Sequence, residues 1–250
     1  VIFVGVMLIF GVLAGLCYRL SPLISGSGIP QVAAQLGGHL QSKWQSVLPF
    51  KFIGGLLTLG GGLTLGREGP SVQIGASIGQ GCSDLLRRPI SERRYMIVGG
   101  ASAGLAAAFN APIAGAIFAL EEMHHHFSPR ALISAMTAAF SANFIAGLVM
   151  SDQPVLFFDH VAPLPLKHYL TVVLIGIVTG FSGVLFNRCI LWGKKIYQRL
   201  RLHWVLTGII PFLIVAICGL ILPDLFGSGE HLIFLPVEGD YNFGYLLMLF

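Results

Sequence analysis

The chain has 250 residues, a formal net charge of +4 and a mean hydropathy of +0.81. Only 10% of its residues are charged and 55% are hydrophobic, whereas a soluble domain carries about 25% charged residues. This composition excludes an ordinary soluble domain and indicates a polytopic helical membrane protein. The basic residues form two short clusters, which are typical of cytoplasmic loops or lipid-headgroup contacts rather than nucleic-acid sites.

The apolar runs predict helices, in chain order, at residues 1–19, 29–40, 47–65, 70–86, 92–109, 112–125, 129–150, 166–200, 204–222 and from Tyr241 onward. Several are shorter than the roughly 20 residues that cross a bilayer, and Gly and Pro interrupt them. Such discontinuous helices are tolerated only where they face protein or a watery cavity, so they indicate a transport site. Because Val1 lies inside an apolar run, we expect the chain to be a fragment.

An internal repeat predicts two related halves. Residues 22–28, PLISGSG, align with residues 223–229, PDLFGSG, and each segment follows an apolar run of similar length. Transporters often contain two halves of opposite orientation. We therefore expect residues 1–150 to form the first half and residues 151–250 to begin the second.

The first candidate motif is SGSGIPQ, which runs from Ser25 to Gln31. Glycine allows sharp turns and close approach to a ligand, and Pro30 suits the first turn of a helix. Ser27 would then lie just before a helix N-terminus, where a hydroxyl and free N–H groups attract anions. A simple capped helix start explains the same residues, and the motif alone favours that interpretation.

The second motif is GREGP, from Gly66 to Pro70. It places Glu68 at a helix N-terminus, where N–H groups stabilise its charged form while desolvation in a membrane favours protonation. Such a carboxylate can exchange places with an anion and carry a proton when it leaves. Arg67 would supply positive potential. A structural ion pair is the alternative, but ionisable residues at membrane depth mark functional sites by default.

Lys51 is the single charged residue between Ser46 and Leu65. Its ammonium group would add positive potential along the same path as Arg67, or its long stem would let the charge reach the lipid headgroups. We favour the first interpretation because of the neighbouring GREGP motif.

A third segment ends in an acidic pair, Glu121 and Glu122, followed by His124–His126. The acids are either carboxylates at a membrane–water boundary or a second proton-handling group, and the residues alone leave both interpretations open. A carboxylate-bridged metal site needs two Glu-x-x-His pairs on facing helices, and one is visible. A surface histidine cluster is therefore favoured, and no metal is expected.

Together, GSGIP at 26–30, GREGP at 66–70 and AGLAAAFNAPIAG at 103–115, in this order and spacing, resemble the ClC chloride channel/transporter family. The resemblance implies an all-α inverted-repeat membrane protein, a homodimer with one anion pathway per subunit. Ser27 would coordinate chloride, Glu68 would be the gate and external proton acceptor, and Glu122 the internal proton relay beside Glu121. The expected anion-site residues are Gly26, Ser27, Gly28, Ile29, Pro30, Lys51, Gly66, Arg67 and Gly69.

The acid at Glu122 favours coupled chloride/proton antiport over a passive chloride channel, which is the alternative function. A membrane-embedded metalloenzyme built on the acidic pair and the histidines is a more distant hypothesis. The resemblance implies no enzyme activity, no cofactor, no nucleic-acid partner and a multi-pass location in a bacterial inner membrane. The chain departs from the family where acids often follow GSGIP, because Gln31 and Ala33 stand there.

Overall fold

The computed structural model describes residues 2–124, 127–149, 165–200, 202–233 and 244, and the regular elements among them are helical. The chain divides into two compact units, one formed by residues 1–155 with 204–250 and the other by residues 156–203. The helix predicted from Tyr241 onward and the boundary predicted at residues 150 and 151 lie outside the described residues, apart from Gly244. The division into halves at that boundary stays a prediction.

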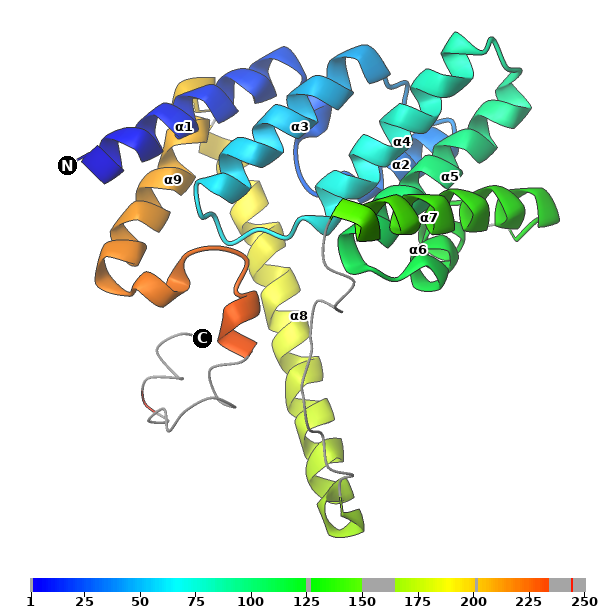
Figure 1. Cartoon of the computed structure of the whole chain (residues 1–250). Helices are drawn as coiled ribbons and strands as arrows, with labels where there is room; N and C mark the ends of the chain where they lie inside the picture. The colour runs from blue at the N-terminus through cyan, green and yellow to red at the C-terminus, as the bar shows by residue number, and fades with distance from the viewer. Residues whose placement is uncertain (1, 125–126, 150–164, 201, 234–243, 245–250) are drawn as a thin grey trace. The chain divides into compact units, whose positions relative to one another are not determined.

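Figure 1 shows the helices of both units. The first unit contains α1 (Ile2–Leu20), α2 (Ile29–Leu36), α3 (Trp44–Gly60), α4 (Glu68–Leu85), α5 (Ile90–Phe109), α6 (Pro112–Phe118), α7 (Pro129–Val149) and α9 (Trp204–Ile221). It also contains the 3-10 helices η1 (Pro22–Ile24), η4 (Pro223–Leu225) and η5 (Glu230–Ile233), and the π-helix η2 (Ala119–His124). The second unit contains η3 (Leu166–His168) and α8 (Tyr169–Leu200).

Glycines account for the main differences from the predicted helix bounds. α2 ends at Leu36 rather than residue 40, because Gly37 and Gly38 follow and Gly38 has a φ of +78°. α3 ends at Gly60 rather than residue 65, and Gly62 turns the chain with a φ of +73°. The helix predicted over residues 112–125 is instead a short α-helix continued by a π-helix, so the prediction of one uniform helix is wrong there.

Four described helical segments are long and apolar enough to cross a membrane: Ile2–Leu20, Pro129–Val149, Leu166–Leu200 and Trp204–Ile221. α2 and α6, by contrast, have 8 and 7 residues, which corresponds to only about 10–12 Å of helix. The prediction that several helices are too short to cross a bilayer is therefore confirmed for α2 and α6. Half-length helices expose their termini at membrane depth, where a site can be built.

Close glycine contacts join α4, α5 and their neighbours in the first unit. Gly75 and Gly100 face each other so tightly that a Cβ on either would collide with the carbonyl oxygen of the other. A Cβ on Gly104 would likewise collide with the carbonyl oxygen of Ser71. α7 packs on α5 through fully buried alanines such as Ala135 (Figure 1). Small residues let helix backbones approach, which is the usual basis of helix association in membranes.

The two segments that align in the sequence, residues 22–28 and 223–229, have similar local structure. α1 packs against α9 through Gly11, Gly15 and Gly208, and each helix leads into a 3-10 helix and a glycine loop. We call residues 22–28 the first loop and residues 223–229 the second loop. Ser25 has φ −63° and ψ +141°, and the equivalent Phe226 has φ −75° and ψ +135°. The repeated glycines all have positive φ: +74° and +106° at Gly26 and Gly28, and +92° and +79° at Gly227 and Gly229.

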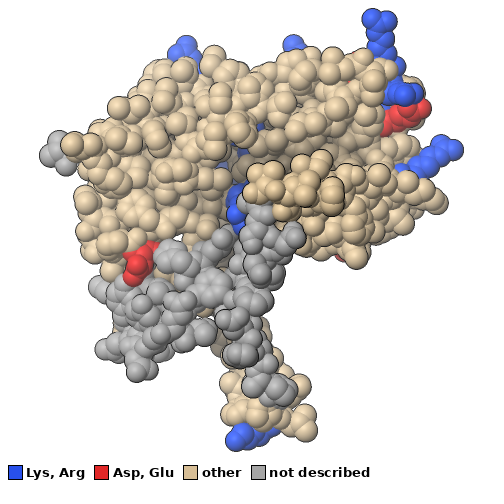
Figure 2. Space-filling model, in the orientation of Figure 1, with Lys and Arg blue, Asp and Glu red and all other residues tan. Residues whose placement is uncertain are grey.

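Charged side chains are sparse on the face shown in Figure 2 and gather near the turn between α4 and α5. There, Arg93 Nε lies 3.4 Å from Asp84 Oδ1, and Arg88 Nη1 lies 3.7 Å from Glu92 Oε2. Exposed ion pairs of this kind contribute about 1 kcal/mol or less to stability. Their place at the end of two apolar helices fits a membrane–water boundary.

Candidate functional site

The SGSGIPQ and GREGP motifs, which are far apart in the sequence, are in direct contact. A Cβ on Gly69 would lie 2.5 Å from the carbonyl oxygen of Ser27 and 2.8 Å from its Cβ. A Cβ on Gly28 would lie 3.0 Å from the carbonyl oxygen of Gly69 and 2.7 Å from Gln73 Cβ. Only glycine permits this approach at either position. The N-termini of α2 and α4 therefore meet.

Both helix starts leave backbone N–H groups available. Among the described residues, no acceptor receives a hydrogen bond from the backbone N–H groups of Gly26, Ser27, Gly28 and Ile29, at the end of the first loop and the start of α2. The same holds for Gly66, Glu68 and Gly69 at the start of α4. Unpaired N–H groups and the positive helix dipole end attract a negative charge, typically by 0.3–1 kcal/mol per helix end at an exposed site. Two such ends together form a candidate anion site.

Glu68 is the first residue of α4 and is half-buried. Its carboxylate occupies the space that a Cβ on Gly66 would need. The side chain is therefore directed back toward the residues that precede the helix. Arg67 precedes it as the N-cap residue, and its carbonyl accepts the Oγ hydrogen bond of Ser71 at 2.8 Å. The structure thus places a carboxylate at the helix start that also carries the unpaired N–H groups of Gly66, Glu68 and Gly69.

Lys51 is 5% exposed, and its ammonium group donates to the carbonyl oxygens of Ile24 and Gly26, both at 2.8 Å. The sequence predicted a lysine that supplies positive potential, and the structure adds that it is bound to the first loop. It therefore lies on the carbonyl side of the peptide unit that joins Gly26 to Ser27. Among the described residues, no carboxylate lies within ion-pair distance of Lys51.

Three glutamines that the sequence reasoning did not single out as site residues hold the segments around α2. Gln31 Nε2 donates to the Ser25 carbonyl, and Gln73 Nε2 donates to the Leu23 carbonyl at 2.9 Å. Beyond the other end of α2, Gln80 Nε2 donates to the Ser42 carbonyl at 2.7 Å. Gln73 and Gln80 are two turns apart on α4 and are 3% and 2% exposed. Polar residues recurring on one face of an otherwise apolar helix were the available signal.

Glu121 and Glu122 lie on the π-helix η2 and are exposed, while Leu120 and Met123 on the same helix are buried against α2. A π-turn is wider than an α-turn and is frequent at functional sites. Among the described residues, no group of three His, Cys, Asp or Glu side chains could hold a metal ion. His125 and His126 lie outside the described residues.

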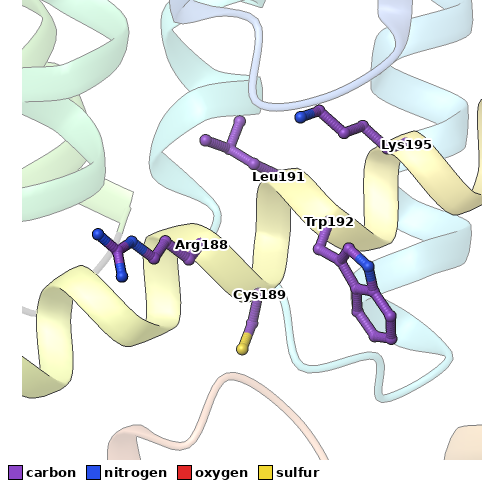
Figure 3. A pocket seen from close by; sticks show the side chains of 5 residues that line it. All are labelled: Arg188, Cys189, Leu191, Trp192 and Lys195. Atoms are coloured by element: carbon purple, nitrogen blue, oxygen red, sulfur yellow. The ribbon is translucent and has the colours of Figure 1, made fainter.

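A separate hollow in the second unit runs along α8 (Figure 3) and is lined by Arg188, Cys189, Leu191, Trp192 and Lys195. All five lining residues come from one helix, and their side chains point to different sides of it. None of them belongs to the SGSGIPQ, GREGP or acidic-pair segments, although Lys195 is part of the second basic cluster. The hollow therefore adds no residue to the candidate site.

The chain resembles a known family and its members over nearly its whole length. The family model described as "Voltage gated chloride channel" matches residues 9–250. The chain is 36% identical over 241 residues to the H(+)/Cl(-) exchange transporter ClcA of Citrobacter koseri, and equally to that of Salmonella paratyphi B. Each match covers 93% of this chain and 50% of the relative, so the chain spans about half the length of the curated relatives it matches.

Two solved structures share the fold. A slow cyanobacterial Cl−/H+ antiporter aligns over 99% of this chain and 60% of its own, with a TM-score of 0.86 and 32% identity. A CLC-type fluoride/proton antiporter aligns over 99% of this chain and 73% of its own, with a TM-score of 0.71 and 26% identity. The all-helical architecture with half-length helices is therefore that of this group of structures.

Proposed function

Since the chain belongs to the voltage-gated chloride channel family, we propose that the full-length protein exchanges chloride for protons across a membrane. Relatives named as proton/chloride exchangers support coupled exchange. The observation that carries the proposal is the meeting of two helix N-termini at Ser27 and Gly69, with the Glu68 carboxylate at the start of one of them. This arrangement suits a small anion that competes with a built-in negative charge.

The anion is held mainly by backbone. Chloride takes hydrogen bonds from the Ser27 hydroxyl and from N–H groups at the starts of α2 and α4, while Arg67 and Lys51 contribute positive potential. The residues proposed for this site are Gly26, Ser27, Gly28, Ile29, Pro30, Lys51, Gly66, Arg67 and Gly69. Such a site binds an anion without a fixed counter-ion at contact distance, so the ion can also leave.

Glu68 is the gate in this proposal. Its carboxylate and chloride compete for the same N–H groups, so one leaves when the other arrives. A carboxylate that leaves loses the stabilisation of those N–H groups and accepts a proton more readily. Protonation and chloride entry are thereby coupled at one side chain, which is the minimum requirement for exchange.

Glu122 is proposed as the internal proton relay, with Glu121 beside it. Both carboxylates are exposed on η2, whose opposite side packs on α2. A proton taken up there reaches the region of the anion site by a route separate from that of chloride. We also propose, from the family resemblance, a homodimer in a bacterial inner membrane.

The test is a simultaneous record of chloride and proton fluxes by the full-length protein in liposomes. We expect a chloride gradient to drive protons uphill, and we expect Glu122→Gln to remove proton flux while chloride flux persists. Glu92→Gln, which removes an exposed carboxylate at the α4–α5 turn, is the matched control and leaves both fluxes unchanged. Chloride flux without any proton movement would establish a passive channel and refute exchange.

A further inference from the structure

Side chains from three helices donate hydrogen bonds to the carbonyl oxygens of the first loop. Gln73 of α4, Lys51 of α3 and Gln31 of α2 donate to them, and Lys51 donates twice. The carbonyls bound in this way belong to four consecutive residues: Leu23, Ile24, Ser25 and Gly26. The donor–acceptor distances are short. Lys51 Nζ lies 2.8 Å from each of its two carbonyl oxygens, and Gln73 Nε2 lies 2.9 Å from the Leu23 carbonyl oxygen. We call these three side chains the carbonyl clamp.

The carbonyl clamp has a direct electrostatic consequence for an anion. A carbonyl oxygen carries partial negative charge and repels chloride, whereas the N–H group of the same peptide attracts it. The clamped carbonyls of Ser25 and Gly26 share their peptide units with the N–H groups of Gly26 and Ser27, and these two N–H groups have no acceptor among the described residues. The clamp therefore determines which side of the peptide units is presented at the candidate site.

Among the described residues, the second loop adopts the same backbone shape without side-chain donors at three of the four equivalent carbonyls. It has the same 3-10 turn, the same positive-φ glycines and similar dihedral angles. Yet within the described part of the chain, no side chain donates to the carbonyls of Leu225, Phe226 or Gly227. Since the fold of the loop forms without these donors, their presence on the first loop calls for another role.

We propose that Gln31, Lys51 and Gln73 are positioning residues of the anion site. They bind the carbonyls of the first loop so that its N–H groups and the Ser27 hydroxyl face the anion. Lys51 does so from a buried position, so its positive charge also lies directly behind the site. None of the three contacts the anion; each acts through the loop backbone.

This inference rests on the anion site proposed above, and one titration separates the two. Chloride affinity is measured by calorimetry on the full-length protein in detergent, together with the melting temperature. We expect Gln31→Met and Lys51→Met each to weaken chloride binding about tenfold, which corresponds to the loss of one or two hydrogen bonds. Lys51→Arg, which keeps the charge and the donors, should recover most of the affinity.

Gln41→Met is the control for a changed glutamine near the same helix, because Gln41 is exposed and outside the clamp, and this variant should bind chloride normally. Folded Gln31→Met and Lys51→Met proteins that bind chloride like the unmodified protein would overturn the positioning role. If Lys51→Met fails to fold, Gln31→Met alone decides between these results. Failure of the unmodified protein to bind chloride would overturn the anion site itself, and with it this inference.

Discussion

The first and second loops are two copies of one backbone motif placed in different surroundings. Each follows an apolar helix, closes a 3-10 turn with a hydrogen bond from residue 25 or 226 to the proline carbonyl, and carries two positive-φ glycines. The first loop packs on the N-terminus of α4 and is bound by the carbonyl clamp. The second is held by the Gly227 N–H, which donates to the Gly62 carbonyl at 3.0 Å, and by the ring of Phe226.

This difference separates shape from chemistry. The glycines and the preceding helix determine the backbone conformation of the loop, because both copies of this sequence have the same conformation. The capacity to bind an anion depends instead on other parts of the chain that contact the loop. At the first loop these are the carbonyl clamp and the N-terminus of α4. Matched substitutions in the two loops therefore test which properties belong to the motif and which to its surroundings.

The largest difference is expected for Gly28→Ala against Gly229→Ala. Both positions have positive φ, so alanine is strained in each by about 1 kcal/mol or more. At Gly28 the new methyl group also meets Gln73 and the Gly69 carbonyl, whereas at Gly229 the nearest atom is a Leu232 methyl at 3.8 Å. We expect a loss of about 3–4 kcal/mol at Gly28 and about 1 kcal/mol at Gly229.

Denaturant titration of the two variants measures this difference, with chloride affinity determined alongside. Chloride binding should be lost in Gly28→Ala and retained in Gly229→Ala. Equal destabilisation of the two variants would mean that the contact with α4 contributes nothing at the first loop.

A smaller effect, on stability alone, is expected for Phe226→Ala. The ring lies over Gly219 and Gly62, where a Cβ on either would collide with it, and it stacks edge-on against Phe3 at 5.4 Å. Because the ring is partly exposed, its loss should lower the free energy of unfolding by about 2 kcal/mol, below the range for a fully buried phenylalanine. Calorimetric chloride affinity should be unchanged, and a matching loss of affinity would show that the second loop also supports the site.

The smallest expected effect concerns the serines of the two GSG sequences. Ser27→Ala removes one hydroxyl donor to the bound anion, which should weaken chloride binding roughly tenfold. Ser228→Ala, at the equivalent exposed position, should leave chloride binding unchanged. Titration of both variants is the measurement, and equal affinities would remove Ser27 from the anion site.

Much of the fold follows from local sequence signals. Apolar runs located the membrane helices, and Gly and Pro marked where α2 and α4 begin. The π-helix η2 could not be predicted, because the apolar residues of its buried side, Leu120 and Met123, suit an α-helix equally well. These two residues are buried in the same core as Val32 and Leu36 of α2, a contact that the local sequence does not indicate.

The site was predictable to the extent that it is built from side-chain motifs. Ser27, Arg67 and Glu68 stand in distinctive glycine-flanked sequences, so their positions at helix N-termini could be inferred. The carbonyl clamp could not, because the acceptors of Gln73 and Gln31 are backbone oxygens, which have no residue signature. Lys51 was singled out as a lone charge in an apolar run, but neither its burial nor its carbonyl partners could be inferred.

The central claim is that the first loop and the N-terminus of α4 together bind an anion. Crystals of the full-length protein soaked in bromide test it directly, because bromide replaces chloride and scatters anomalously. Our account predicts an anomalous peak within hydrogen-bonding distance of Ser27 Oγ and the N–H groups at the start of α4. Ordered bromide elsewhere in the protein, with none at this position, would contradict it.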